Sequence, residues 1–310
     1  FVDQLGPAVV VARLLQGVGQ AMTMTAFWTY IADRVPVENR TQGIALFGIS
    51  GLAPIGIAPA LGDLILTGNW GYRGLFLAAA GFSVGAFALS MFLERSGVHT
   101  GAATSGFGSV LRSPELRPIW LVSLFVSLGF TTAFIFVKTY VATSHLGTVG
   151  PFFAAYASMA VAWRLAFAWV PDRVGPARMI PPGLGLYALG LAVLGLVPST
   201  LGLVVGGIFT GLGHGISYPV ILGIATVRAA PRARGTATAI FTAVFDLTLF
   251  AASPVIGAAI GLFGYRAMFL GVAFVITLGA LGFTRIDRTA RMAMHPAATG
   301  GPAIAPVPHA

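Results

Sequence analysis

The hexapeptide Gly71-Tyr72-Arg73-Gly74-Leu75-Phe76 is followed 193 residues later by a second version of itself, Gly264-Tyr265-Arg266-Ala267-Met268-Phe269. Nearly the same offset aligns residues far from this pair. At 194, Gly17-Val18-Gly19 falls on Gly211-Leu212-Gly213. A register that drifts so little over such a stretch indicates a duplicated unit. The sequence repeat therefore predicts that the protein is built from two related halves.

The alignment of the two copies leaves the residues from roughly 110 to 194 without a counterpart in the first half. That unmatched stretch holds three apolar segments. We therefore expect three such segments, on the order of 90 residues, to precede Phe1, because a duplicated unit should be complete in both copies. The chain also starts without an initiator Met, which agrees with an N-terminal truncation.

The composition is that of a membrane protein. Charged residues make up 9% of the chain, hydrophobic residues make up 56%, and the mean hydropathy is +0.88, whereas soluble domains carry about 25% charge. The absence of cysteine excludes disulfides, Cys-ligated zinc and thiol catalysis. The net charge of +9 comes from basic residues scattered through loops, not from a basic patch with interleaved aromatics of the kind that binds nucleic acid.

Nine apolar segments are long enough to cross a bilayer, whose hydrocarbon core of ~30 Å needs about 20 residues of helix. They are continuously apolar, whereas the strands of membrane barrels alternate over ~10 residues. The segments are 7–32, 43–66, 73–93, 117–142, 151–171, 178–197, 201–227, 235–262 and 265–284. The predicted fold class is an all-α, polytopic helical bundle in a membrane.

The arginines that lie between these segments are distributed unequally. Cytoplasmic loops collect Lys and Arg, so alternate loops should differ sharply in their number. One set of loops, together with the tail, holds thirteen arginines: Arg34, Arg40, Arg95, Arg112, Arg117, Arg173, Arg178, Arg228, Arg232, Arg234, Arg285, Arg288 and Arg291. The other set holds Arg73 and Arg266. We expect the first set and the C-terminal tail to be cytoplasmic, and the protein to lie in the inner (plasma) membrane.

Five short motifs resemble those of the major facilitator superfamily of secondary transporters. Residues 13–19, Arg-Leu-Leu-Gln-Gly-Val-Gly, look like its fourth-helix signature. Residues 58–63, Ala-Pro-Ala-Leu-Gly-Asp, are similar to its fifth-helix antiporter motif, with Ala58 and Asp63 where the family has Gly. Residues 172–178 resemble its charged hairpin, and residues 39–43 and 232–235 occupy the equivalent cytoplasmic loops of the two halves.

The resemblance implies that the nine spans are helices four to twelve of twelve, in a monomer without a cofactor. Residues 1–93 would be the C-terminal three helices of the N-terminal half, and 94–116 a cytoplasmic linker. Residues 117–284 would be a complete six-helix C-terminal half, and 285–310 a tail that we expect to be disordered. The sequence as a whole, including Phe245-Asp246-Leu247, is similar to those of bacterial proton-coupled exporters of drugs and metabolites.

Three ionisable side chains, Asp246, His214 and Arg164, lie near the middle of predicted spans. At ~1.5 Å per residue, Asp246 is ~16 Å and His214 ~20 Å from the nearer end of its span. A charge at this depth costs ~2.5–3.5 kcal/mol on insertion scales, so each calls for a partner or a function. Asp246 is the first candidate for a proton or substrate-charge site, because a carboxylate among apolar groups can exchange a proton near neutrality. A buried ion pair with Arg164 is the alternative.

The other two central residues also allow two interpretations. His214 can exchange a proton near pH 7, or it can stay neutral as a hydrogen-bonding residue where helices touch, since Gly213 and Gly215 flank it. Arg164 either meets a charge on the substrate or anchors the cytoplasmic end of the bundle. It precedes Asp172 by eight residues, about two helical turns, so both side chains could face one direction.

Two further groups complete the candidate residues. The resemblance implies a part in proton transfer for Arg13, with Gln16 beside it, and a hydrogen-bonded structural arginine is the alternative. The loop with Asp172, Arg173 and Arg178 carries no catalysis. Its charges could bond to neighbouring helix ends in one state and separate in another, forming a gate, or they could be ordinary cytoplasmic charges.

These observations predict a secondary active transporter that works by alternating access, with proton-coupled efflux of a drug or metabolite as its function. Its partners would be a small-molecule substrate, the proton and the lipid bilayer. An importer or symporter of a sugar or organic acid is the alternative. An integral membrane enzyme is disfavoured, because the five histidines are too dispersed to bind a metal. An ATP-driven pump is disfavoured because the sequence has no glycine-rich phosphate-binding loop. A channel is disfavoured because the sequence has no apparent repeated pore loop or charge ring.

Overall fold

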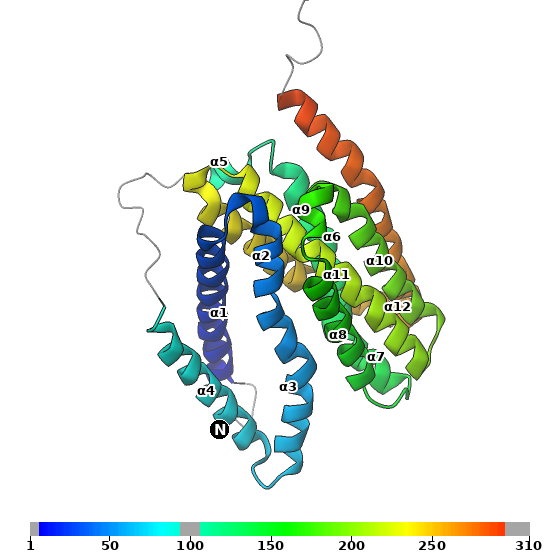
Figure 1. The fold of residues 1–310 in the computed structure, drawn as a ribbon. Coiled ribbons are helices and arrows are strands. Elements are labelled where there is room, and N and C mark those ends of the chain that lie inside the picture. The colour runs from blue at the N-terminus through cyan, green and yellow to red at the C-terminus, as the bar shows by residue number, and fades with distance from the viewer. Residues whose placement is uncertain (1–5, 94–105, 295–310) are drawn as a thin grey trace, which may run out of the picture.

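The computed structural model describes residues 6–93 and 106–294, and within these residues it contains helices and no β-strand (Figure 1). Two single 3₁₀ turns, Val37–Asn39 and Pro231–Ala233, precede α2 and α12. The longer elements are α1 (Pro7–Arg34), α2 (Arg40–Phe47), α3 (Ile49–Thr67), α4 (Gly71–Ser90), α5 (Phe107–Leu111), α6 (Arg117–Thr131), η2 (Thr132–Phe136), α7 (Val137–Thr143), α8 (Gly150–Phe167), α9 (Val170–Val174), α10 (Pro176–Leu196), α11 (Thr200–Arg228) and α12 (Arg234–Met294).

Six helices in the described part of the chain are long and apolar enough to cross a membrane. Seven of the nine predicted spans fall on these six, because the stretch Pro231–Asp287 carries two predicted spans. The other two, 7–32 and 151–171, coincide with α1 and α8, which are helical but are not among the six. The all-α membrane bundle predicted from the sequence is confirmed.

The first glycine of the repeated hexapeptide has a positive φ in both copies. Gly71 has φ +49° and opens α4, and Gly264 has φ +77° and breaks α12 into 234–263 and 265–294. Both values lie in the left-handed region, which glycine adopts without the steric cost that a side chain would bring. This turn separates the last two predicted spans, as the sequence predicts.

Helices α6 to α12 form a closely packed bundle with α11 between α8 and α10. A Cβ atom at Gly211 would overlap the backbone of Tyr156 on α8, and one at Gly213 would come within 2.6 Å of the backbone nitrogen of Tyr187 on α10. Small residues let membrane helices approach this closely, and the gain is direct van der Waals contact. The Ser199 hydroxyl caps α11 by accepting a hydrogen bond from the Gly202 nitrogen at 3.1 Å.

Helices α1 to α4 lie beside this bundle, and Figure 1 shows α1 and α3 next to it with α4 farther out. No described residue of α4 is buried. Tyr156, Tyr187 and Phe152, which are among the largest fully buried side chains, belong to the α6–α12 bundle. We call the end of the bundle that carries α5, α9 and the α11–α12 turn the basic end, since Arg173 and Arg232 lie there.

The structure corrects one expectation at the edge of an element. The tail does not become irregular at 285: α12 continues to Met294, because no Gly or Pro interrupts the helix before Pro296, and residues 295–310 lie outside the described residues. The predicted linker of 94–116 is not contradicted; within it, α5 forms and buries Val110. Residues 94–105 of the linker lie outside the described part.

Candidate functional site

A cavity of about 350 Å³ lies between α1 and α3 on one side and α6, α8, α11 and α12 on the other. It brings together side chains that are more than two hundred residues apart in the chain. Its lining includes Gln20, Met24 and Trp28 of α1, Gly48 and Gly51 at the start of α3, Phe130 of α6, Arg164 of α8, His214 and Tyr218 of α11, and Thr242, Phe245 and Asp246 of α12. Three predicted site residues, Asp246, His214 and Arg164, thus line one cavity.

Arg164 is the most enclosed charge of this cavity, with 2% of its surface exposed. Its Nε donates a hydrogen bond to the Gly215 carbonyl on α11 at 3.4 Å. A Cβ atom at Gly48 would overlap its Nη1, so glycine leaves the space that the guanidinium occupies. Within residues 6–93 and 106–294, no carboxylate forms an ion pair with Arg164.

His214 is held where α8 and α11 touch. Its Nδ1 shares a hydrogen bond with the Tyr156 hydroxyl, and its ring lies 5.5 Å from that of Phe130. A Cβ atom at the neighbouring Gly215 would come within 3.1 Å of the Ala160 Cα, so the helices are in close contact there. This is the arrangement of a hydrogen-bonding residue at a helix contact, although the imidazole also lines the cavity.

Asp246 lines the cavity from α12 and is exposed to it. The ion pair with Arg164 that the sequence left open is not formed between these two described residues. Tyr218 lines the same cavity as both of them. The cavity therefore contains one cationic and one anionic side chain that do not neutralise each other by direct contact.

Aromatic rings form much of the remaining wall. Trp28 and Tyr218 join α1 to α11, with ring centroids 5.7 Å apart. The ring of Phe245 lies 5.2 Å from that of Phe130 and 5.5 Å from that of Tyr218. Phe134 stacks behind Phe130 at 4.0 Å and belongs to the π-helical turn η2, an irregularity that is frequent at functional sites.

Arg13 and Gln16 do not line the cavity. Both are exposed on α1, where the Arg13 Nη1 donates a hydrogen bond to the Gln16 Oε1 at 3.0 Å. Gln20 and Met24, which sequence reasoning missed, follow Gln16 at four-residue steps and do line it. Residues four apart share a helix face, so this spacing is the signal that could have found them.

The charged loop of 172–178 is hydrogen-bonded to α2 through Asp172. The Asp172 Oδ2 accepts a hydrogen bond from the Gln42 backbone nitrogen at 3.0 Å, at the N-terminal end of α2. The Arg173 guanidinium lies 4.6 Å over the ring of its own neighbour Trp169. The Arg178 Nη1 donates to the Val174 carbonyl at 3.2 Å, so both arginines stay within their own loop.

Helix α2 consequently has a charge of the favourable sign at each end. Asp172 lies at its N-terminus and Arg164 lies against its C-cap, Gly48, which complements the helix dipole of about half a charge at each end. Although α8 ends at Phe167 and α9 begins separately at Val170, Arg164 and Asp172 both lie against α2.

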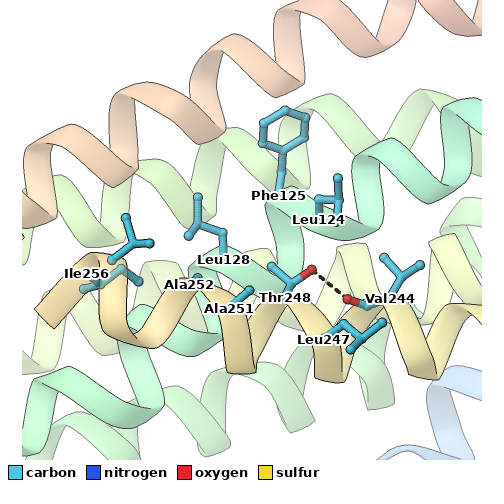
Figure 2. Close-up of a pocket in the computed structure, with 10 residues that line it drawn as sticks. Leu124, Phe125, Leu128, Val244, Leu247, Thr248, Ala251, Ala252 and Ile256 are labelled. Atoms are coloured by element: carbon cyan, nitrogen blue, oxygen red, sulfur yellow. Dashed lines mark hydrogen bonds between the residues drawn. The ribbon is translucent and has the colours of Figure 1, made fainter. Parts of the chain in front are cut away.

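A second hollow between α6 and α12 is apolar (Figure 2). Leu124, Phe125 and Leu128 lie along one wall, and residues from Val244 to Ile256 lie along the other. Its one polar side chain, Thr248, donates a hydrogen bond to the Val244 carbonyl of its own helix at 2.6 Å. With no charged residue in its lining, this hollow offers nothing to orient a polar solute.

Comparison with known proteins gives one family. The Major Facilitator Superfamily model matches residues 1–200 and 164–306. An uncharacterized MFS-type transporter of Burkholderia mallei is 26% identical over 290 residues, which cover 91% of this chain and 69% of that protein. An uncharacterized MFS-type transporter of Salmonella typhimurium is 27% identical over 279 residues, or 87% and 69%.

Two solved structures share the fold. The human organic anion transporter MFSD10 (TETRAN) superposes with a TM-score of 0.70 at 17% identity, over 84% of this chain and 67% of that one. A bacterial homologue of the iron transporter ferroportin, in an outward-facing state, gives 0.63 at 18% identity, over 89% and 70%. At such identities the likeness shows the fold and nothing about the solute.

Proposed function

Because this chain belongs to the Major Facilitator Superfamily, a family of secondary transporters, we propose that it exports a small solute across the inner membrane in exchange for protons. The basic end faces the cytoplasm in this proposal. That orientation rests on the excess of arginines at this end and on the positive-inside rule. The two groups of helices on either side of the cavity would then rock about the bound solute.

The cavity of about 350 Å³ is the observation that carries the proposal. Its volume is within the range of small-molecule sites, roughly 300–1,000 Å³, and such sites combine apolar walls with a few polar groups. Here the walls are aromatic rings, and the polar groups include Asp246, His214 and Arg164. The site lies between the two groups of helices, where relative motion would expose it to either side in turn.

Asp246 is the proposed proton carrier. It is exposed to the cavity and has no ion-pair partner among the described residues, so a proton or a solute can reach it. Intramembrane carboxylates that face a cavity are the usual members of proton relays. His214 is the weaker candidate, because it is 6% exposed and its Nδ1 is already bonded to Tyr156.

The gate in this proposal is the contact between Asp172 and the N-terminus of α2. It joins α9 to α2 at the basic end, across the two groups of helices. Close by, a Cβ atom at Gly223 would come within 2.9 Å of the Thr41 Oγ1, so α2 and α11 also touch there. We propose that these contacts hold the basic end closed and separate when the cavity opens toward it.

The test uses Asp246→Asn in proteoliposomes that contain a pH-sensitive dye. A panel of aromatic acids, amines, zwitterions and uncharged compounds identifies a solute whose addition moves protons. For that solute, we expect Asp246→Asn to abolish uphill transport and to preserve downhill exchange, because the amide keeps the size of the side chain but cannot carry a proton. Thr242→Val, one turn away in the same cavity, is the matched control and should transport normally.

Two results would contradict the proposal. Normal proton-driven transport by Asp246→Asn would remove Asp246 from the coupling mechanism. A failure of the variant to fold would give Asp246 a structural role in place of the coupling role.

A further inference from the structure

We propose that the solute is an amphipathic zwitterion: its carboxylate binds Arg164, its ammonium group binds Asp246, and its apolar part packs against Trp28 and Tyr218. This assignment of a solute class rests on the proposed function of the cavity.

The Arg164 side chain is enclosed but makes few hydrogen bonds. Only 2% of it is exposed, and a charge taken out of water is costly unless it is paired and hydrogen-bonded. A guanidinium has five N–H donors, and the one hydrogen bond of Arg164 within the described residues uses Nε, at a long 3.4 Å. No hydrogen bond of Nη1 or Nη2 is found within the described residues, and Arg164 is part of the cavity lining.

The C-terminus of α2 neutralises only part of the Arg164 charge. Arg164 lies against Gly48, the C-cap of α2, and a helix C-terminus carries about half a negative charge. That partial charge reduces the cost of burying the guanidinium but leaves a net positive site. The planar fork of an arginine fits a carboxylate through two parallel hydrogen bonds. A carboxylate is therefore the group that completes this end of the cavity.

Asp246 supplies a negative charge in the same cavity. Asp246 lines the same cavity and is exposed, yet no ion pair joins it to Arg164. A solute with one charge would satisfy one of these side chains and would meet the other as a like charge. A zwitterion satisfies both. It also explains exchange, because its ammonium group and a proton would compete for the Asp246 carboxylate.

The walls determine the rest of the solute. The rings of Trp28 and Tyr218 lie 5.7 Å apart at one side of the cavity, and Phe130 and Phe245 continue the aromatic surface. Aromatic faces bury apolar area and also attract a cation. An aromatic or long apolar body between the two charged groups is the complement of this surface.

The test is a binding assay on the purified chain in neutral detergent, with no gradient and no transport step. One scaffold supplies matched probes: tryptophan and the dipeptide Trp-Gly as zwitterions, tryptophan methyl ester as the cation, N-acetyltryptophan as the anion and N-acetyltryptophanamide as the uncharged form. We expect at least one zwitterion to bind about ten- to a hundredfold more tightly than each singly charged probe, because it adds a charge-assisted contact.

Two substitutions assign the charges. Arg164→Gln should weaken binding of the zwitterion but not of the cationic ester, which loses a like charge. Asp246→Asn should weaken binding of the zwitterion but not of the N-acetyl acid, which likewise loses a like charge. A purely structural role for Arg164 would lower the affinity for all probes alike, and that pattern would overturn the proposal.

A second pair of variants covers the case in which Arg164→Gln fails to fold. Gly48→Ala places a methyl group where Nη1 lies, whereas Gly185→Ala, on α10 and outside the cavity lining, adds a methyl group with nothing within 4 Å. We expect Gly48→Ala to weaken binding of the zwitterion and Gly185→Ala to preserve it. Equal effects would contradict the role of Arg164. Selective binding without coupled transport would refute the exchange function alone, whereas coupled transport of a singly charged or neutral compound would refute the zwitterion alone.

Discussion

The contact between Asp172 and α2 gives the most direct quantitative prediction. The Asp172 Oδ2 accepts a hydrogen bond from the Gln42 nitrogen at 3.0 Å, and this bond holds the basic end closed in the proposed cycle. Asp172→Asn keeps a side-chain oxygen as acceptor but removes the charge. Asp172→Ala removes both. We expect each change to raise the fraction of molecules in which the basic end is open.

The magnitudes follow from the geometry of this contact. A negative charge at a helix N-terminus is worth about 0.3–1 kcal/mol, and a hydrogen bond to a charged group about 1.5–3 kcal/mol. Because Asp172 is only partly buried, values near the low end apply. Asp172→Asn should therefore cost about 1 kcal/mol and Asp172→Ala about 2 kcal/mol, which correspond to roughly fivefold and thirtyfold more of the open form.

The chain contains no cysteine, so a single introduced thiol reports on opening without background. Thr41→Cys is a suitable reporter, because Thr41 is 3% exposed and faces Gly223 at the basic end. Its rate of alkylation by N-ethylmaleimide should rise about fivefold with Asp172→Asn and about thirtyfold with Asp172→Ala, since a buried thiol reacts through the open form.

Arg178→Gln is the matched control, because Arg178 lies in the same loop and, among the residues that the structure describes, bonds to the Val174 carbonyl of that loop and not to α2. The alkylation rate should not change in this variant. An unchanged rate in Asp172→Ala would refute the reasoning, and so would an equal rise in Arg178→Gln, because the effect would then come from loop charge alone.

The remaining predictions concern the free energy of unfolding, measured by thermal denaturation in detergent. Gly264→Ala should destabilise the protein by about 1–2 kcal/mol, because φ at Gly264 is +77°, whereas Gly257→Ala on the same helix, with nothing within 4 Å, should be neutral or slightly stabilising. Gly211→Ala should destabilise by about 1–3 kcal/mol, because its methyl group would overlap the backbone of Tyr156; Gly185→Ala, with open space around it, should not. Equal melting temperatures within either pair would contradict the close contact or the backbone strain on which the prediction depends.

The fold was predictable from the sequence because a bilayer imposes local rules. Every backbone polar group in the hydrocarbon region must be satisfied within its own segment, so continuous apolar runs must become helices. The same local logic located the breaks: Gly71 and Gly264 occupy equivalent places in the repeat, and both adopt positive φ. The end of α8 at Phe167 and the π-helical turn at Thr132–Phe136 were not predicted, because hydropathy is nearly the same on both sides of each.

The candidate site was only partly predictable. Depth within a span follows from counting residues, and it selected Asp246, His214 and Arg164, which the structure does place around one cavity. Counting cannot show which residues meet across helices. The space that Gly48 leaves for the Arg164 guanidinium depends on how α3 packs against α8, more than a hundred residues later in the chain.

The sequence by itself therefore determined the elements, their order and the charges that lie within the membrane, since these depend on local hydrophobicity and backbone preference. Only the tertiary structure decided how those charges are used. It bonded Asp172 to one end of α2 and set Arg164 against the other, and it left Arg164 and Asp246 in one cavity without an ion pair. The physical reason is that such contacts depend on the close packing of small residues between distant helices, which composition and periodicity do not encode.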